Sequence, residues 1–380
     1  MCSGNNNSVN RSDNARRPNS RRVSEFGFFV LEPPARSNGL MRISRKIATA
    51  VLLVHALAGA QTVAKYAGEF MAIGVGGRAL GLGGAHVALV NDVSAGYWNP
   101  GALARIEYPE AMIMHDERFG NLINYDFAAV AIPYGADASL GISVLRLGVD
   151  GVPDTRAAWI DVNGNGIFDA PDQLDYGNIT YFNTADWAVY FTYSKQSSST
   201  LQYGANVKLI RRSLADQSAT GIGFDIGALY APHPSVLLGI NAQDITTTLV
   251  AWSTGRNELV SPTLKIGGAY FFEFLGGRFA PAMDVDVRFE NRRFASMAHA
   301  GPISFDPHAG LEFDYKKTVA LRVGYNDVKQ LSLGAGLHLR MLDIDYSFSR
   351  FAADETLGNT HRISLRFVLQ DEQFGRGSSQ

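Results

Sequence analysis

The chain has 380 residues, enough for one large barrel or two average domains, and its formal net charge of −2 excludes the basic field that a nucleic-acid partner needs. Glycine is abundant at 39 residues while charged residues make up only 18%, a composition that favours repeated strands and turns over helices. Cys2 is the single cysteine, which excludes a disulfide framework and a CxxC metal site.

Two N-terminal segments are predicted to lie outside the fold. Residues 1–40 are polar and unpatterned, which predicts disorder or a mis-assigned extension. Residues 41–60 have the form of a signal peptide, with a basic start, an apolar run of twelve residues (47–58) and a small-residue cleavage site ending at Ala60. The apolar run is too short to span a membrane, and its alternative is a buried core helix. We therefore expect Sec-type cleavage near Ala60.

The stretch from Gly74 to Leu103 is rich in glycine and alanine and lies in a predicted hatch segment, residues 61–107. Gly74 to Ala79 fits a loose dinucleotide-binding pattern, but that pattern must follow a buried strand of a parallel sheet. Because no such unit is predicted here, we interpret the glycines as sites where backbone packs closely on backbone. The alternative is that this stretch holds the first one or two strands and forms no plug.

Residues 108–369 alternate apolar and polar side chains in fourteen predicted strands. Tight joins such as 134–136 alternate with long joins such as 150–182 and 291–305. An even strand number with long loops at one end is typical of an outer-membrane β-barrel, and a soluble double-sheet fold is the alternative. The predicted strands are 108–117, 121–133, 137–149, 183–196, 200–213, 219–231, 235–248, 261–274, 278–290, 306–315, 317–326, 329–340, 341–351 and 359–369.

The glycine-rich stretch, ending in Trp98-Asn99-Pro100-Gly101, resembles the N-terminal motif of PorV/PorQ-type proteins, which belong with the FadL-like outer-membrane barrels. The resemblance implies an all-β fold, a transmembrane antiparallel barrel of about fourteen strands with a glycine-rich hatch in its lumen. Gly101 replaces the usual alanine, and a polar tail, 370–380, follows the last strand in place of a terminal aromatic residue. The hatch motif comprises Gly77, Arg78, Gly81, Gly83, Gly84, Asn91, Asp92, Trp98, Asn99 and Pro100.

The same resemblance implies a location in the bacterial outer membrane and a role as a surface component or shuttle of a type IX-like protein secretion system. Outer-membrane lipid, secretion components and exported cargo are the implied partners. The alternative function is FadL-like transport of hydrophobic or small solutes. No histidine lies in a nucleophile or zinc motif, so no enzyme is predicted. Charged residues on the polar strand faces are predicted to pair across a wet lumen: Asp284, Asp286, Glu290, Glu312, Asp314, Asp343, Asp345, Arg288, Arg322, Arg340, Arg362 and Arg366.

Residues 161–172 form the sharpest local motif and lie in the predicted extracellular insertion 150–182. Oxygen-bearing side chains fall at positions 1, 3, 5, 9 and 12 of a calcium loop, with glycine at position 6. Aspartate replaces the usual glutamate at position 12, and no flanking helices are predicted. We expect Ca²⁺ to order this loop, and an Asn/Gly-rich turn is the alternative. The expected ligands are Asp161, Asn163, Asn165, the Ile167 carbonyl, Asp169 and Asp172.

Overall fold

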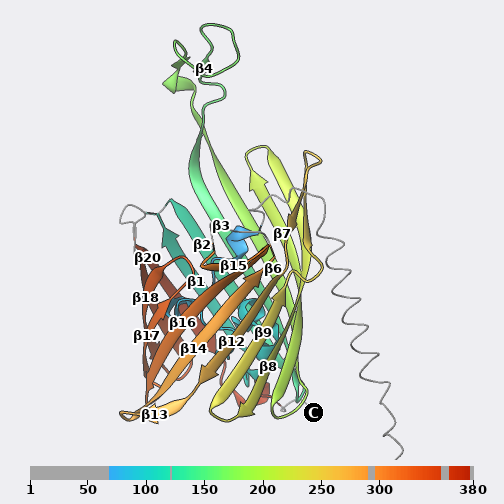
Figure 1. Ribbon diagram of the computed structural model, residues 1–380, viewed down its shortest axis with the longest axis vertical. Helices are drawn as coiled ribbons and strands as arrows, with labels where there is room; N and C mark the ends of the chain where they lie inside the picture. The colour runs from blue at the N-terminus through green and yellow to red at the C-terminus, as the bar shows by residue number, and fades with distance from the viewer. Residues whose placement is uncertain (1–67, 120–121, 290–295, 352–358, 377–380) are drawn as a thin grey trace, which may run out of the picture. The chain divides into compact units, whose positions relative to one another are not determined.

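The computed structural model describes residues 68–119, 122–289, 296–351 and 359–376, and these residues form a barrel with a segment inside it (Figure 1). The predicted extension 1–40 and the predicted signal peptide 41–60 lie outside the described residues. Among the residues that are described, no helix combines the length and the apolar character needed to cross a membrane.

Fourteen antiparallel strands pair in sequence order, and β1 pairs with β20, so the sheet closes on itself. Closure confirms the predicted barrel and shows that the double-sheet alternative is wrong. The barrel strands are β1 (Glu110–Arg118), β2 (Ile123–Tyr134), β3 (Ala138–Asp154), β6 (Thr180–Gln196), β7 (Leu201–Leu214), β8 (Gln217–His233), β9 (Val236–Gln243), β12 (Thr263–Tyr270), β14 (Gly277–Arg288), β16 (Ile303–Tyr315), β17 (Val319–Tyr325), β18 (Gln330–His338), β19 (Leu342–Phe351) and β20 (Thr360–Val368).

Most predicted strands match these bounds within a few residues, but the predicted strand 235–248 is interrupted after Gln243. Asp244 and Thr247 adopt positive φ angles of 54° and 61°, which a strand does not accommodate. The chain then forms a separate hairpin of β10 (Thr248–Trp252) and β11 (Asn257–Val260), and β10 pairs back onto β8. Short strands β13 (Phe272–Phe274) and β15 (Ala298–Ala300) pair with β14 and β16 at the ends of the barrel.

Alternation along each strand places apolar side chains outside and polar side chains inside. On β14 the outward Met283 is 61% exposed, whereas its inward neighbours Asp284 and Asp286 are 1% and 2% exposed. An apolar outer surface around a charged interior is the reverse of a soluble protein and fits a barrel surrounded by lipid. Exposed outward residues occur on many strands, including Val130, Ile142, Phe191, Leu209, Ile226, Ile240, Ile266, Leu321, Leu333 and Ile363.

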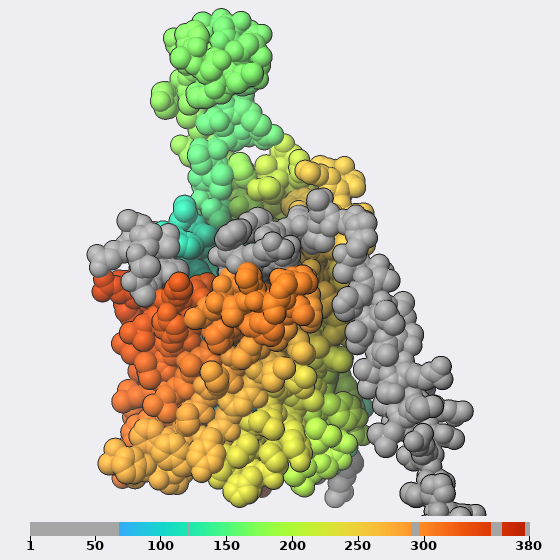
Figure 2. All heavy atoms as spheres, viewed as in Figure 1, coloured from blue at the N-terminus to red at the C-terminus, as the bar shows by residue number. Residues whose placement is uncertain are grey.

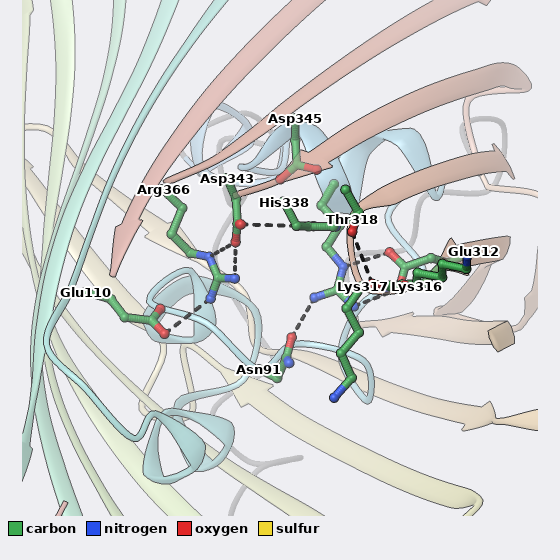
Figure 3. Close-up of polar contacts among 12 residues, drawn as sticks. Asn91, Glu110, Glu312, Lys316, Lys317, Thr318, His338, Asp343, Asp345 and Arg366 are labelled. Carbon is green, nitrogen blue, oxygen red and sulfur yellow. Dashed lines mark hydrogen bonds and ion pairs between the residues drawn. The ribbon is translucent and has the colours of Figure 1, made fainter. Parts of the chain in front are cut away.

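Residues 68–107, which we call the hatch, lie inside the barrel and contain no strand, so the alternative that they form the first strands is wrong. Their elements are short: η1 (Glu69–Met71), α2 (Gly77–Gly81), α3 (Ala95–Trp98) and η2 (Pro100–Arg105). From Val75 to Leu103 nearly every side chain is buried. The close-up in Figure 3 shows this segment coiled within the ring of strands.

The two ends of the barrel differ. At the turn end, strands join through tight turns such as 135–137, and η2 leads directly into β1 there. At the loop end, β3 and β6 extend as a hairpin beyond the neighbouring strands, with a register shift between Val149 and Val152. Its tip carries β4 (Trp159–Ile160) paired with β5 (Gln173–Leu174), followed by η3 (Tyr176–Asn178), and it stands clear of the barrel in Figure 2.

Candidate functional site: the contact between hatch and barrel wall

An ion-pair network fastens α2 of the hatch to one side of the barrel. Arg78 donates from Nε and Nη2 to the two carboxylate oxygens of Glu312 on β16, at 2.8 and 2.9 Å. Glu312 also accepts from Arg322 Nε at 2.7 Å, and Arg322 Nη1 reaches Asp345 Oδ1 at 2.6 Å. Arg78 Nη1 donates to Asn91 Oδ1 within the hatch, so one guanidinium joins hatch and wall (Figure 3).

Glycines let this part of the hatch lie directly on the strand backbones. A Cβ atom at Gly77 would lie 2.7 Å from the carbonyl oxygen of Asp345. At Gly83, where φ is +66°, a Cβ atom would lie 2.6 Å from the backbone nitrogen of Tyr325. Gly81 approaches Gly334 in the same way. These motif glycines therefore leave backbone-to-backbone contacts that any side chain would displace.

The Trp98-Asn99-Pro100-Gly101 corner is bonded to the opposite side of the barrel. Asn99 Oδ1 caps η2 by accepting from Gly101 N, and Asn99 Nδ2 donates to the carbonyls of Val87 and Ala228, both at 3.0 Å. The carbonyl of Trp98 accepts from Asn241 on β9. Pro100 is the first residue of η2, where its fixed φ and missing N–H carry no penalty.

The remaining motif residues hold the middle of the hatch. Gly84 has φ +87° and packs beside His308, whose Nδ1 lies 2.9 Å from the Gly83 carbonyl oxygen. Asp92 is 4% exposed and accepts from both Ser94 N and Ser94 Oγ, so it organises the turn before α3. The motif therefore contacts two opposite sides of the wall and does not converge on one centre.

An apolar cluster fills the space between the hatch and the wall. Most of its wall residues lie on β1, β2, β3, β6, β7, β8 and β10, and it also includes Leu237 on β9, Ala269 on β12, and Ala280 and Ala282 on β14. The Tyr97 and Trp98 rings lie 5.1 Å apart, and Tyr97 also meets the ring of Tyr190 on β6. The cluster continues toward the loop end, where Phe70 lies against the guanidinium of Arg212. Other buried members include Met71, Met112, Met114, Tyr125, Phe127, Leu145, Ile210 and Val250.

Solved structures with the same architecture are known. The chain matches the CymD monoaromatic hydrocarbon channel with a TM-score of 0.52 and 13% identity, over 79% of this chain and 98% of that one. It matches a Pseudomonas aeruginosa FadL homologue with a TM-score of 0.51 and 12% identity, over 77% and 98%. The fold is a FadL-like barrel. No protein-family model matches the chain, and a search of curated proteins finds no match either.

Two residues of the FadL-like fold, Asp284 on β14 and Tyr97 in the hatch, were not predicted to hold the hatch in place. Asp284 was expected only to line the lumen, but its Oδ2 accepts from the backbone N–H groups of His86 and Val87 at 2.6 and 2.8 Å. Tyr97 Oη donates to the Met71 carbonyl and accepts from Gly74 N. No local sequence pattern marks either role, because the partners are distant in the chain or belong to the backbone.

Most predicted lumen charges are paired inside the FadL-like barrel. Asp286 accepts from Lys265 at 2.5 Å, Arg362 lies 3.0 Å from Asp116, and Asp343 pairs with Arg366. Arg340 is different, because it lies exposed in the turn between β18 and β19. Glu290 lies outside the described residues. Such internal pairs satisfy charges that would otherwise be costly within a membrane.

The predicted calcium ligands occupy the tip of the β3–β6 hairpin and lie close together. Asp161 accepts from the backbone N–H groups of Gly164, Asn165 and Gly166. Asp169 accepts from the side-chain amides of Asn163 and Asn165, both at 2.8 Å. Within the described part of the chain, no group of three His, Cys, Asp or Glu side chains has the arrangement of a metal centre. Calcium binding at 161–172 therefore stays a prediction.

Proposed function

We propose that the protein is a bacterial outer-membrane channel for small hydrophobic molecules, with the hatch as its gate. The observation that carries the proposal is the apolar cluster inside the lumen. It runs from Phe70 near the loop end to Tyr97 beside Tyr190, through a barrel interior that is otherwise charged. A pore for hydrophilic solutes has no need of an aromatic face within its lumen.

The comparisons support this proposal. The two matching structures are described as a monoaromatic hydrocarbon channel and a FadL homologue, and 98% of each is covered. Outer-membrane barrels have their long loops outside the cell and their short turns in the periplasm, so we assign the loop end to the extracellular side and the turn end to the periplasm. A hydrophobic molecule would enter beside Phe70 and move along the aromatic residues toward α3. Because the hatch is packed against the wall, passage requires part of it to shift.

Uptake of radiolabelled toluene by Gram-negative cells with an intact outer membrane tests the proposal. Cells that express the chain are expected to take up toluene severalfold faster than cells with an empty vector. The variant Phe70→Glu places a charge in the apolar path and is expected to abolish the gain. Tyr176→Glu is the matched control, since Tyr176 is 78% exposed on the hairpin, far from the lumen. Equal uptake by expressing and empty cells would refute the channel.

One observation favours a second candidate, the secretion role implied by PorV/PorQ-type resemblance. The β3–β6 hairpin presents Ile167, Phe168 and Tyr176 to solvent, with exposures of 64%, 63% and 78%, beyond the loop end. Exposed apolar groups at a projecting tip fit contact with another protein. Purification of the membrane-extracted chain with secretion components or exported cargo would support this role. Loss of that association on deletion of residues 155–178 would assign it to the hairpin.

A further inference from the structure

A row of polar and charged side chains crosses the outer surface of the barrel on five adjacent strands. Strand register places them as direct neighbours: His115 on β1, Asp126 on β2, Arg146 on β3, Trp187 on β6 and Arg211 on β7. All five point away from the lumen, because their positions alternate with buried ones. Charged side chains on the lipid-facing surface are costly at the membrane centre and need an explanation.

The row marks the upper edge of the apolar surface. On β3 the outward positions below Arg146 are Val144, Ile142 and Leu140, while those above it are Gly148 and Asp150. On β1 and β2 the same change falls at the row, where Ile113 and Ala128 lie below His115 and Asp126, and Glu117 and Asn124 lie above them. On β20 the change falls one outward position higher, between Ile363 and His361. Arg146 and its neighbours therefore lie where hydrocarbon gives way to lipid headgroups, with Trp187 placed as an interfacial aromatic residue.

Two guanidinium groups flank the Trp187 ring in this row. Arg146 is held in place, because its Nη1 lies 3.1 Å from Asp126 Oδ2 and its guanidinium carbon lies 5.7 Å from the centre of the Trp187 ring. The Arg211 side chain is exposed and makes no hydrogen bond or ion pair with any residue that the structure describes. Neighbouring strands are about 4.8 Å apart, so the two Cα atoms are roughly 10 Å apart and both side chains can reach one anion.

A groove of about 480 Å³ opens on the outer surface directly below the row. The small side chain of Ala128 lies between Val144 and Ile113 at its floor, and Ile363 and Leu365 form its far edge. His115, Asp126, Arg146 and Trp187 border its upper end. The surface thus combines an apolar groove that runs down the outer wall with two arginines, Arg146 and Arg211, at the upper end of the groove.

We propose that this surface binds one phosphorylated lipid of the outer leaflet. The phosphate lies between Arg146 and Arg211 over Trp187, and one acyl chain lies in the groove over Ala128. Arginine matches phosphate oxygens with two parallel N–H donors, and the groove accepts hydrocarbon but no charge. Asp126 orients Arg146 from the other side, because its Oδ2 lies 3.1 Å from Arg146 Nη1. His115 in turn orients Asp126, because its Nδ1 lies 2.7 Å from Asp126 Oδ1. This inference uses the outer-membrane placement of the proposed function but not its transport role.

Native mass spectrometry of the full chain in detergent micelles, with added bisphosphorylated lipid A as the probe, tests the proposal. Wild-type protein is expected to retain one lipid, and Arg211→Gln and Arg146→Gln are each expected to weaken binding about tenfold or more, since each removes a charge-assisted hydrogen bond. Arg211→Lys keeps the charge but not the paired donors and is expected to bind with intermediate strength. Arg340→Gln, at the exposed turn on the other end, is expected to bind as wild type does.

Two further experiments test whether the groove binds an acyl chain and whether the bound phosphate belongs to a lipid or is free inorganic phosphate. Ala128→Trp fills the groove and is expected to weaken lipid binding although every charge remains. Inorganic phosphate at the same concentration is expected not to displace the lipid, because it lacks the acyl chain. Variants are compared only when their heat-modifiable gel mobility shows a folded barrel. Equal lipid retention by wild type, Arg211→Gln and Ala128→Trp would overturn the proposal, as would full displacement by inorganic phosphate.

Discussion

At the scale of single residues, glycine decides how closely the hatch approaches the wall. Gly83 and Gly135 both have a left-handed backbone, with φ of +66° and +64°. A Cβ atom at Gly83 would lie 2.6 Å from Tyr325 N, whereas one at Gly135 would meet no atom within 4 Å. The two positions share backbone strain and differ in packing, so a comparison of the two isolates the packing contribution.

Gly83→Ala is therefore expected to destabilise the barrel more than Gly135→Ala. Left-handed strain alone costs about 1–2 kcal/mol, and the forced separation of hatch and β17 adds about 1–3 kcal/mol. Unfolding by guanidinium chloride in detergent micelles, followed by tryptophan fluorescence, measures the free energy of unfolding of each variant. Equal losses for the two variants would show that Gly83 is needed only for its φ angle.

Arg78 is the residue that ties α2 to the barrel, and its removal should leave the ion pairs within the wall intact. In Arg78→Gln, Glu312 keeps Arg322 at 2.7 Å, so the wall network survives while the hatch loses its tether. The loss of charge-assisted bonds is expected to lower the unfolding free energy by about 1.5–3 kcal/mol and to raise ion leakage. Chloride efflux from proteoliposomes measures the leakage, with Arg340→Gln as a control. Unchanged efflux would show that the tether does not limit hatch motion.

At the scale of elements, the hairpin tip has the chemistry for a calcium loop. Calorimetric titration of the folded chain with Ca²⁺ is expected to show one site with a Kd of about 10⁻⁴ to 10⁻³ M, the range of extracellular modules. Asp161→Asn and Asp169→Asn are expected to abolish it. Asp216→Asn is the control, because Asp216 is an exposed carboxylate that pairs with Arg156 outside the loop. Binding that survives both loop variants would contradict the ligand set.

The same loop carries an acid-sensitive contact. Desolvation raises the pKa of Asp172, but hydrogen bonds from the Trp159 indole and from the backbone N–H groups of Val162 and Asp169 outweigh it and hold the pKa below its usual range. A lowered folded-state pKa stabilises the loop above the unfolded value of about 3.9, and this stabilisation is lost as pH falls through the folded value.

Trp159 fluorescence, taken as the difference from Trp159→Phe, is accordingly expected to stay constant from pH 7 to about 5 and to change only below about 4. Asp172→Asn should remove that transition. A midpoint near pH 6 would show that the contact titrates through another group.

The strands could be predicted from sequence and the contacts between distant elements could not. Lipid outside and charge inside impose strict alternation, so predicted 278–290 and observed Gly277–Arg288 nearly coincide. No such pattern predicts the end of the strand at Gln243. The strand ends there because Asp244 turns away from it and accepts a hydrogen bond from Lys208 on β7. The tail was predicted only as polar, yet Arg376 donates to the carbonyl of Ile106 at the C-terminal end of the hatch. These two contacts join residues 36 and 270 positions apart, and strand periodicity reveals neither of them.

At the scale of the whole molecule, the FadL-like barrel is closed by a hatch held on two sides by different forces. Ion pairs fasten it to β16 through β20, while the apolar cluster and the Asn99 corner hold it against the wall from β1 through β9. Glycines allow close backbone approach on both sides. Charge-assisted bonds are directional, whereas apolar packing is not. The apolar side is therefore the side along which a hydrophobic molecule can replace hatch contacts with contacts of its own.

Gated passage is tested most directly by a disulfide that locks the hatch to the wall. A Cβ atom at Gly96 on α3 would lie 3.9 Å from the Cβ of Ser143 on β3, close to the spacing of about 3.8 Å in natural disulfides. Cys2 precedes the predicted cleavage site, so the pair Gly96→Cys and Ser143→Cys would be alone in the processed chain. Each single variant under the same oxidant is the control.

The measurement is toluene uptake by cells carrying this double variant, before and after reduction with dithiothreitol. If the hatch is the gate, cells with the oxidised protein take up no more toluene than empty-vector cells, and reduction restores their uptake to the level of the single variants. Uptake that is equally fast in the oxidised and reduced states would contradict a moving hatch as the gate.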